Sequence, residues 1–481
     1  PQTLDPRKVR SLNDVNILKI FMEGLTRINK SGSPELAMAE KVHISDDLKT
    51  YTFTLRKTQW SNGDPVRAQD FEYAWKKSLL PTFNSPNANM LYVIKNAREI
   101  KKGDLPLSLL GVDAVDDYTL TIKLNHPTPY FLDLVSHPIL FPVNQLLDKA
   151  NPTWAEQQNS YVTNGPFQME DWKHHNAIVA VKNKEYWDNK TVRLNQLNMI
   201  MVSEDTGFKM FETKELDWDG SPFSKIPSDA IQSLQGRHKL ETAPVNATAF
   251  IRINVDSSPF DSQKMRRAFG LAINRQAIVE HITQGNQIPA TGIVPIAMGL
   301  QETPYFEDGS IAMAQELFEE ALAEKQITKE ALGEITFLYA ANGQASVLAQ
   351  AIQYQWYEAF GIAVRLEPVE DKVCFDRIGK NNYTLALGSW FADVNDPVNF
   401  LEVFKSKANG INNTNWENLA YAKLLDIANT CKSKEERCKL LKESEKLIIN
   451  EMPLIPLYHY NLLYIKDTEL KDVVLTSLGN I

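Results

Sequence analysis

The spacing of apolar and polar positions predicts the local structure of the first half of the chain. Residues 51–56 and 116–124 alternate between the two classes, as half-buried strands do. The stretch "SNGDP" at 61–65 predicts a turn, and apolar positions at helical spacing over 71–78 predict a helix. Residues 165–188 alternate on both sides of a polar tip, which predicts a β-hairpin.

A longer ordered pattern lies in the second half. It predicts strands at 334–340, 362–369 and 383–390, separated by helices at 345–360 and 373–379. Gly361 stands where a glycine commonly ends a helix. A strand–helix–strand–helix–strand order indicates a parallel sheet with right-handed crossovers, so the fold class is α/β.

The stretch "ALGSWFADVNDP" at 386–397 ends the last of these strands with an isolated acid, Asp393. In open α/β sheets, ligands bind beyond the carboxyl ends of the strands, where an aspartate would bind an ammonium or guanidinium group. Asp, Asn and Pro also favour turns. From spacing alone, Asp393 is either a turn residue, which the composition of the stretch favours, or a socket for a positive charge.

Composition narrows the class of protein. The 481 residues are enough for two or three domains, and 43% of them are hydrophobic, as in ordinary folded proteins. The net charge of −9 argues against a nucleic-acid partner, because phosphate binding needs a basic surface. No apolar run is long enough to span a membrane, and no targeting segment is recognisable at the start. The protein is therefore either cytosolic, or a targeting segment was removed ahead of the first residue of this numbering.

Candidate chemistry is sparse. The chain lacks the motifs of nucleophilic hydrolases, P-loop proteins, zincins and dinucleotide-binding proteins. The pair His174-His175 falls at the predicted hairpin tip, which favours a solvated loop over a metal site. Cys431 and Cys438 are equally compatible with a local disulfide and with two free thiols. We therefore expect no catalysis, no cofactor and no metal, although paired carboxylates that meet only in space stay open.

Several segments, taken in order, carry a resemblance to a known family. They are "LDP" (4–6) with "FMEGLTRIN" (21–29), "ISDDLKTYTFTLRKTQWSNGDPVRAQDFEYAW" (44–75), "TNGPFQMEDW" (163–172), "MRRAFGLAINRQAIV" (265–279), "GSWFADVNDPVNFL" (388–401) and "IPLYHYNLLYI" (455–465). Together they resemble the extracytoplasmic solute-binding proteins of peptide ABC importers, the oligopeptide- and dipeptide-binding family. The oligopeptide-binding branch looks most similar.

The resemblance implies a two-lobed periplasmic-binding-protein-like fold with mixed sheets and an extra α/β subdomain, hinged around a central cleft. The first lobe would comprise residues 1–23, 146–246 and 461–481. The additional subdomain would be 24–145, and the second lobe 247–460. Closure would be a hinge motion that buries the ligand.

The resemblance also implies function. The protein would be a monomeric, extracytoplasmic component, periplasmic or a membrane-anchored lipoprotein, that delivers oligopeptides to a membrane-embedded ABC permease. An extended peptide would bind as an added strand, and Asp393 would match the aspartate that takes its α-amino group. The other residues expected to contact the ligand are Arg10, Ser11, Leu12, Ser389, Trp390, Phe391, His459 and Tyr460.

Some positions depart from the family pattern. Leu387 and Ala345 stand where oligopeptide binders carry basic groups for the peptide carboxylate. Asp371 replaces a cleft tryptophan, and Arg10 replaces an acid. The amine end of the site is therefore kept, while the carboxylate end looks rebuilt.

Two interpretations of this departure stay open. The carboxylate is met by Arg10, Arg377 or Lys380, or the ligand is modified, as a cell-wall stem peptide is. More distant alternatives are a metal chelate as cargo, for which His459 offers little, and a secreted peptidase or hydrolase.

Overall fold

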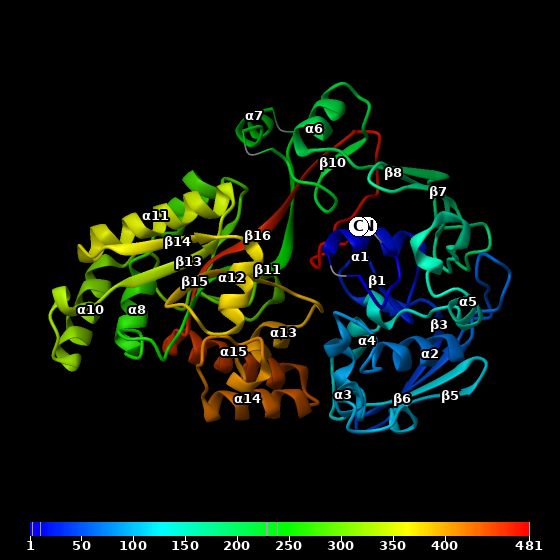
Figure 1. The fold of residues 1–481 in the computed structure, drawn as a ribbon, viewed down its shortest axis with the longest axis horizontal. Coiled ribbons are helices and arrows are strands. Elements are labelled where there is room, and N and C mark those ends of the chain that lie inside the picture. The colour runs from blue at the N-terminus through cyan, green and yellow to red at the C-terminus, as the bar shows by residue number, and fades with distance from the viewer. Residues whose placement is uncertain (2, 10, 228, 238, 481) are drawn as a thin grey trace. The chain divides into compact units, whose positions relative to one another are not determined.

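The computed structural model describes residues 1, 3–9, 11–227, 229–237 and 239–480, so Arg10 lies outside the described residues. The chain forms two compact units, Pro1–Pro227 with Tyr464–Ile481 and Ser228–Leu463. Both mix helices with strands, as an α/β protein requires (Figure 1). The further division at residues 24–145 stays a prediction.

The first unit is built around small antiparallel sheets. Its strands are β1 Thr26–Ile28, β2 Pro34–Leu36, β3 Ala39–Ile44, β4 Thr50–Leu55, β5 Val112–Asp116, β6 Thr119–Lys123, β7 Phe167–Lys173, β8 Ala177–Lys182, β9 Gln196–Ile200 and β10 Trp218–Gly220. Its helices are α1 Leu12–Phe21, α2 Ala68–Ser78, α3 Ala97–Lys102, α4 Phe131–Leu134, α5 Gln145–Ala150 and α6 Glu204–Glu212.

The strands and helix predicted in this half are confirmed. β4 lies in a sheet of order β3-β4-β6-β5, with Tyr51, Phe53 and Leu55 buried by the pleat. Gly63 has φ +89° in the predicted turn before α2. β7 and β8 form the predicted hairpin, with His174 and His175 exposed at its tip.

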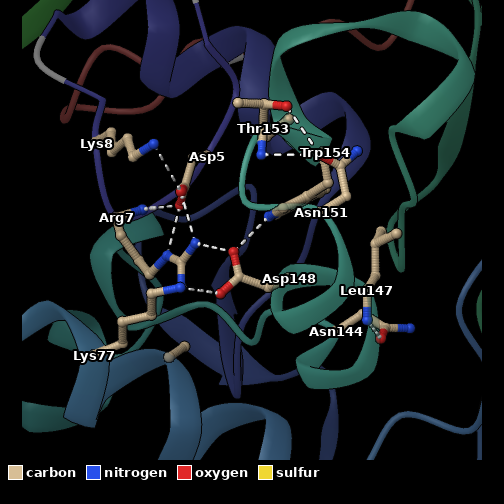
Figure 2. A network of polar contacts seen from close by, with 12 residues as sticks. Asp5, Arg7, Lys8, Lys77, Asn144, Leu147, Asp148, Asn151, Thr153 and Trp154 are labelled. Carbon is tan, nitrogen blue, oxygen red and sulfur yellow. Dashed lines mark hydrogen bonds and ion pairs between the residues drawn. The ribbon is translucent and has the colours of Figure 1, made fainter.

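The N-terminal segment of this unit is held by a buried ionic network (Figure 2). The guanidinium of Arg7 donates to both carboxylate oxygens of Asp5, at 2.8 and 2.7 Å, and to both of Asp148, at 3.0 and 2.7 Å. Lys77 and Tyr73 each donate to Asp148 Oδ2 at 2.6 Å. Arg7, Asp5 and Asp148 are each 1% exposed.

The charges of this network balance, because two carboxylates meet one guanidinium and one ammonium. Burial alone would raise the pKa of Asp148, but the hydrogen bonds and charges of Arg7 and Lys77 lower it well below its usual range. The network ties residues 5–7 to α5 and α2, and so fixes the chain immediately before α1.

The second unit contains a larger sheet. Its strands are β11 Glu241–Ile253, β12 Ile288–Pro289, β13 Ile335–Ala340, β14 Val364–Val369, β15 Leu385–Phe391 and β16 Leu454–Lys466, the last of which continues into the first unit. Its helices are α7 Ile231–Gly236, α8 Gln263–Leu271, α9 Arg275–Ile278, α10 Ile311–Lys325, α11 Gly343–Phe360, α12 Asp371–Gly379, α13 Val398–Leu401, α14 Leu419–Thr430 and α15 Lys434–Glu451.

The predicted β-α-β-α-β order is confirmed. β13 pairs in parallel with β14 and with β15, while β15 pairs antiparallel with β11, giving the order β16-β11-β15-β13-β14 and a mixed sheet (Figure 1). α11 ends at Gly361, which adopts φ +62° and donates its N–H to Tyr357 at 2.7 Å.

Apolar residues cover both faces of this sheet. On one face Ile251, Phe337 and Leu385 pack against α8, α10 and α11 in the main core. On the other, Ala386 and Leu338 pack against Cys374 and Ile378 of α12. β15 is therefore held in the sheet by packing on both of its faces.

Two further properties of the chain bear on its class. Among the described residues, no helix has both the length and the apolar content that crossing a membrane requires. The cysteines are free thiols, so Cys431 and Cys438 are not bridged.

Candidate ligand-binding site

One edge of β15 is only partly occupied. β11 pairs with β15 along its whole length, from Phe391 opposite Ala247 to Leu385 opposite Ile253. On the other edge, β13 pairs only at Leu385 and Ala386. Over the part of the chain that the structure describes, no strand pairs with that edge from Leu387 onwards.

The hydrogen bonds at the two ends of the β11–β15 ladder show which backbone groups face the open edge. Asn254 donates to the carbonyl of Thr384 at 3.0 Å, and Ala392 donates to that of Asn246 at 2.8 Å. Even-numbered residues of β15 therefore bond to β11, since hydrogen-bonded positions alternate along an antiparallel pair. The N–H and C=O groups of Leu387, Ser389 and Phe391 point to the open edge, where an extended chain would add as a strand.

Asp393 lies two residues beyond the end of this strand. Asn399 holds the segment in place, because its Oδ1 accepts from Trp390 Nε1 at 3.0 Å and from the backbone N–H of Asp393 at 3.2 Å. The turn interpretation and the socket interpretation are therefore compatible. Asp393 lies in the bend that follows β15, close in sequence to the open part of its edge.

The environment of Asp393 changes its acidity. The side chain keeps an exposed surface, but the protein atoms crowded around the carboxyl remove much of its hydration. This burial raises the pKa of Asp393 from 3.8 to about 6, against the opposing hydrogen bond of Asn399. A partly dehydrated carboxylate that forms no ion pair with any described residue is suited to receive an ammonium group.

Ser389, Phe391 and Tyr460 lie together on one face of the sheet. The rings of Phe391 and Tyr460 are 5.1 Å apart, and Tyr460 also contacts Tyr458 at 5.1 Å. Burial raises the pKa of the Tyr460 hydroxyl, while its hydrogen bonds with Tyr458 and Ser389 lower it. Phe391 is 46% exposed, so this aromatic surface is available to a ligand.

His459 lies on the opposite face from Tyr460, because neighbouring residues of a strand alternate. It is 3% exposed, and its Nδ1 lies 2.9 Å from Thr248 Oγ1. The Thr248 hydroxyl donates to the carbonyl of Ile293, so His459 is the donor in this pair. Burial lowers the pKa of His459 to about 4, and the imidazole is neutral at pH 7. The structure thus separates His459 from Ser389, Phe391 and Tyr460, and places it on the same face as Trp390, which lies opposite Thr248.

Ser11 and Leu12 belong to the other unit. Ser11 caps α1, accepting from the N–H of Asp14 at 3.1 Å, and Leu12 is the first residue of that helix, 37% exposed. The hydroxyl of Ser11 therefore caps the start of the helix, and the Ser11 backbone is extended with φ −103° and ψ 154°. Their role in binding stays a prediction.

Two of the three residues considered for a ligand carboxylate already have acidic partners, and the third, Arg10, lies outside the described residues. Arg377 donates to Glu367 at 2.9 Å and Lys380 pairs with Asp376 at 2.8 Å. Leu387 and Ala345 pack against the main core, so an apolar contact replaces the basic groups expected there. Asn399 was missed by the sequence analysis, because an asparagine inside "NDPVNF" has no pattern that separates it from an ordinary turn residue.

Two features do not belong to this site. A cavity of about 450 Å³ in the first unit is lined by Lys19, Glu23 and Arg27, among others, and by none of the predicted site residues. Among the described residues, no group of three or more His, Cys, Asp and Glu side chains is arranged to hold a metal ion.

Comparison with known proteins places this geometry in context. Residues 33–412 match the family described as "Bacterial extracellular solute-binding proteins, family 5 Middle". The oligopeptide-binding protein OppA of Bacillus subtilis strain 168 is 38% identical, over 100% of this chain and 90% of the relative. The dipeptide-binding protein DppE of the same strain is 34% identical, over 96% and 86% respectively. The crystal structure of Haemophilus influenzae OppA in complex with RPPGFSPFR has a TM-score of 0.82 at 25% identity, covering 100% of this chain and 95% of that one.

Proposed function

Because the chain belongs to family 5 of the bacterial extracellular solute-binding proteins, we propose that it captures extended oligopeptides and delivers them to the membrane permease of an ABC importer. The names of the two Bacillus subtilis relatives, one an oligopeptide binder and one a dipeptide binder, support a peptide as the ligand. The protein acts by binding and release and is not an enzyme.

The observation that carries the proposal is the open edge of β15 with an acid at its end. A peptide that adds as a strand bonds to the backbone groups of Leu387, Ser389 and Phe391, which are the same for every sequence. Its α-ammonium group pairs with Asp393. Affinity then comes mainly from groups that all peptides share, and selectivity comes from the surrounding side chains.

The other predicted contact residues and the lobes have roles in the same proposal. Ser11 and Leu12, with Arg10, flank the peptide from the first lobe, and Trp390, Phe391 and Tyr460 surround it in the second. The subdomain at 24–145 and the lobes 1–23, 146–246 with 461–481, and 247–460 form the hinged shell. The protein works as an extracytoplasmic monomer, held near the permease by a lipid anchor or retained in the periplasm.

The test is Asp393→Asn, which removes the charge and keeps the shape of the side chain. We expect a free-amine pentapeptide such as pentaalanine amide to bind the variant about ten- to a hundredfold more weakly, because a charge-assisted bond is lost. Isothermal titration calorimetry measures the difference.

Asp376→Asn is the matched control, because Asp376 is exposed on α12 and, among the described residues, forms an ion pair with Lys380 alone. It should leave the affinity unchanged, and an N-acetylated peptide should bind the wild type as weakly as the free-amine peptide binds Asp393→Asn. Equal affinity of the wild type and Asp393→Asn for the free-amine peptide would remove Asp393 from this role.

A further inference from the structure

An arginine beside the open edge of β15, Arg252, has no hydrogen-bond or ion-pair partner among the described residues. Arg252 lies on β11 opposite Ala386 and is half-buried. Its Nε is fully buried and has no hydrogen-bond acceptor. Within the described residues, its guanidinium makes no hydrogen bond and no ion pair. A buried donor left without an acceptor costs free energy, so such a group is expected to have a partner in the working state of the protein.

The position of the guanidinium depends on a glycine. A Cβ atom placed on Gly388 would lie 1.7 Å from Nη1 of Arg252 and 2.9 Å from its Cζ. Gly388 is the residue of β15 diagonally across from Arg252, so the side chain runs from β11 across β15. It therefore passes over the strand at the place where the open edge begins. Any larger residue at 388 would displace it.

Among the described residues, no carboxylate forms an ion pair with this cation. Arg252 stacks on the ring of Phe250 at 4.7 Å. Burial lowers the pKa of Arg252, and the groups that oppose this effect are Tyr383 and Cys374. Burial also raises the pKa of both of these groups, so they are neutral at pH 7. The guanidinium itself remains charged, because arginine does not lose its proton in proteins.

We infer that Arg252, in the gap left by Gly388, binds a carboxylate of the ligand. The inference rests on the proposed function, because it takes an added peptide strand along β15 as its starting point. Arg252 would supply the positive charge for a ligand carboxylate that the side chains of Leu387 and Ala345 do not provide. The rebuilt carboxylate end of the site lies on the opposite face of β15 from Leu387, the face shared by Gly388 and Trp390.

The geometry limits which carboxylate is bound. With its ammonium group at Asp393, the peptide runs back along β15 towards Gly388, antiparallel to that strand. Asp393 is five residue steps beyond Gly388, or roughly 17 Å of extended chain, so the carboxylate lies about three to five residues from the peptide amine. It is either an acidic side chain that points to the face of Trp390 or the terminal carboxylate of a short peptide. The shared chemistry is a carboxylate bound by a guanidinium fork.

The experiment uses pentaalanine amide as a neutral parent peptide. One series carries Glu or Gln at the third, fourth or fifth position of the amide, and a second compares pentaalanine free acid with the amide. We expect wild-type protein to bind at least one carboxylate-bearing peptide about ten- to a hundredfold more tightly than its neutral counterpart. Discrimination of Glu from Gln identifies a side chain as the source, and discrimination of acid from amide identifies the terminus.

Arg252→Gln should abolish this discrimination and leave the affinity for the neutral parent peptide unchanged. Gly388→Ala should do the same with the charge retained, and Arg252→Lys should restore part of the preference. Arg365→Gln is the matched control, because Arg365 is an exposed arginine on β14 of the same sheet and pairs with Glu334 and Glu367. It should behave like the wild type.

Thermal unfolding without ligand separates this role from a structural one. Arg252→Gln removes an unpaired charge, so its midpoint should equal or exceed that of the wild type. Three results would overturn the inference: a lower midpoint for Arg252→Gln, a carboxylate preference retained by Arg252→Gln, or no discrimination by the wild type. If the wild type still bound the parent peptide, the proposed function would be unaffected. Failure of the wild type to bind any of these peptides would instead overturn the proposed function as well.

Discussion

At the scale of single residues, Asp393 and Arg252 share an unusual property. Each carries a charge in a partly dehydrated place, and among the described residues neither forms an ion pair. Arg7 and Asp148 show the usual arrangement of buried charges, in which two opposite charges form an ion pair. Unpaired charges lower the stability of a protein without ligand, and they are found where a ligand completes them.

The raised pKa of Asp393 predicts how binding depends on pH. The carboxylate must be ionised to pair with an ammonium group, and its pKa of about 6 means that it gains a proton as the pH falls from 7 to 5. We expect the affinity for a free-amine peptide to fall about tenfold over this range. Calorimetric titrations at several pH values measure it.

The stability of the unliganded protein should show the opposite trend from this group. A raised carboxyl pKa contributes stability that is fully present below the ordinary value of 3.8 and is lost as the pH rises through about 6.

The control for the affinity prediction is Asp393→Asn, which should flatten the dependence of affinity on pH between pH 5 and 7. A wild-type affinity that is constant over this range would contradict the assignment.

At the scale of elements, β15 was predicted well as a strand but not as a binding edge. The alternation over residues 383–390 identifies the strand, and the structure places it at Leu385–Phe391. Its neighbours depend on contacts that are distant in the sequence, such as Ala247 with Phe391 and Phe337 with Leu385. No local pattern encodes that the pairing of β13 with β15 ends at Ala386, so the open edge was not predictable from spacing.

The network at Asp148 predicts the stability of the first unit. Asp148→Ala leaves Arg7 and Lys77 without their shared carboxylate inside the protein, and we expect a loss of about 3–5 kcal/mol in the free energy of unfolding. Denaturant unfolding at neutral pH measures this loss. The lowered pKa of Asp148 means that its contribution is present above its ordinary value of 3.8 and is lost only as the pH falls through the lowered pKa.

Asp104→Ala is the comparison for this variant, because Asp104 is an exposed acid of the same unit. We expect it to change the free energy of unfolding by less than about 0.5 kcal/mol. A loss below about 1 kcal/mol in Asp148→Ala would show that the network holds residues 5–7 weakly.

At the scale of the whole molecule, the chain passes between its two units at two places, near residues 227 and 463. Few connections allow a hinge, and hinge closure around a ligand is a common response in binding proteins of two lobes. The sequence predicted crossings near 246 and 460 from the resemblance alone. In the structure, the crossing near residue 463 falls within the continuous strand β16, and the crossing near residue 227 lies before β11.

We therefore expect a free-amine pentapeptide to reduce the radius of gyration of the protein in solution. Small-angle X-ray scattering with and without the peptide measures this change. Asp393→Asn at the same peptide concentration should show a smaller change, because less of it is bound. An identical scattering curve for the wild type with and without saturating peptide would exclude closure as the response to the ligand.

The properties that depend on neighbouring residues were available from the chain alone. Alternation and helical spacing identified β4, the β7–β8 hairpin and the β13-to-β15 run, because burial of one face imposes a period of two or about 3.6 residues. The family was available too, because its motifs are continuous segments. Asp393 entered the candidate site by this route.

The properties that depend on distant residues were decided by the tertiary structure. Asn399 and Arg252 have no motif, and their significance appears only when Trp390, Gly388 and the open edge of β15 surround them. The separation of His459 from Tyr460 likewise follows from which face of β16 is buried. A sequence records which side chains are present, whereas pairing partners, open edges and missing counter-charges are relations between segments that only the folded chain brings together.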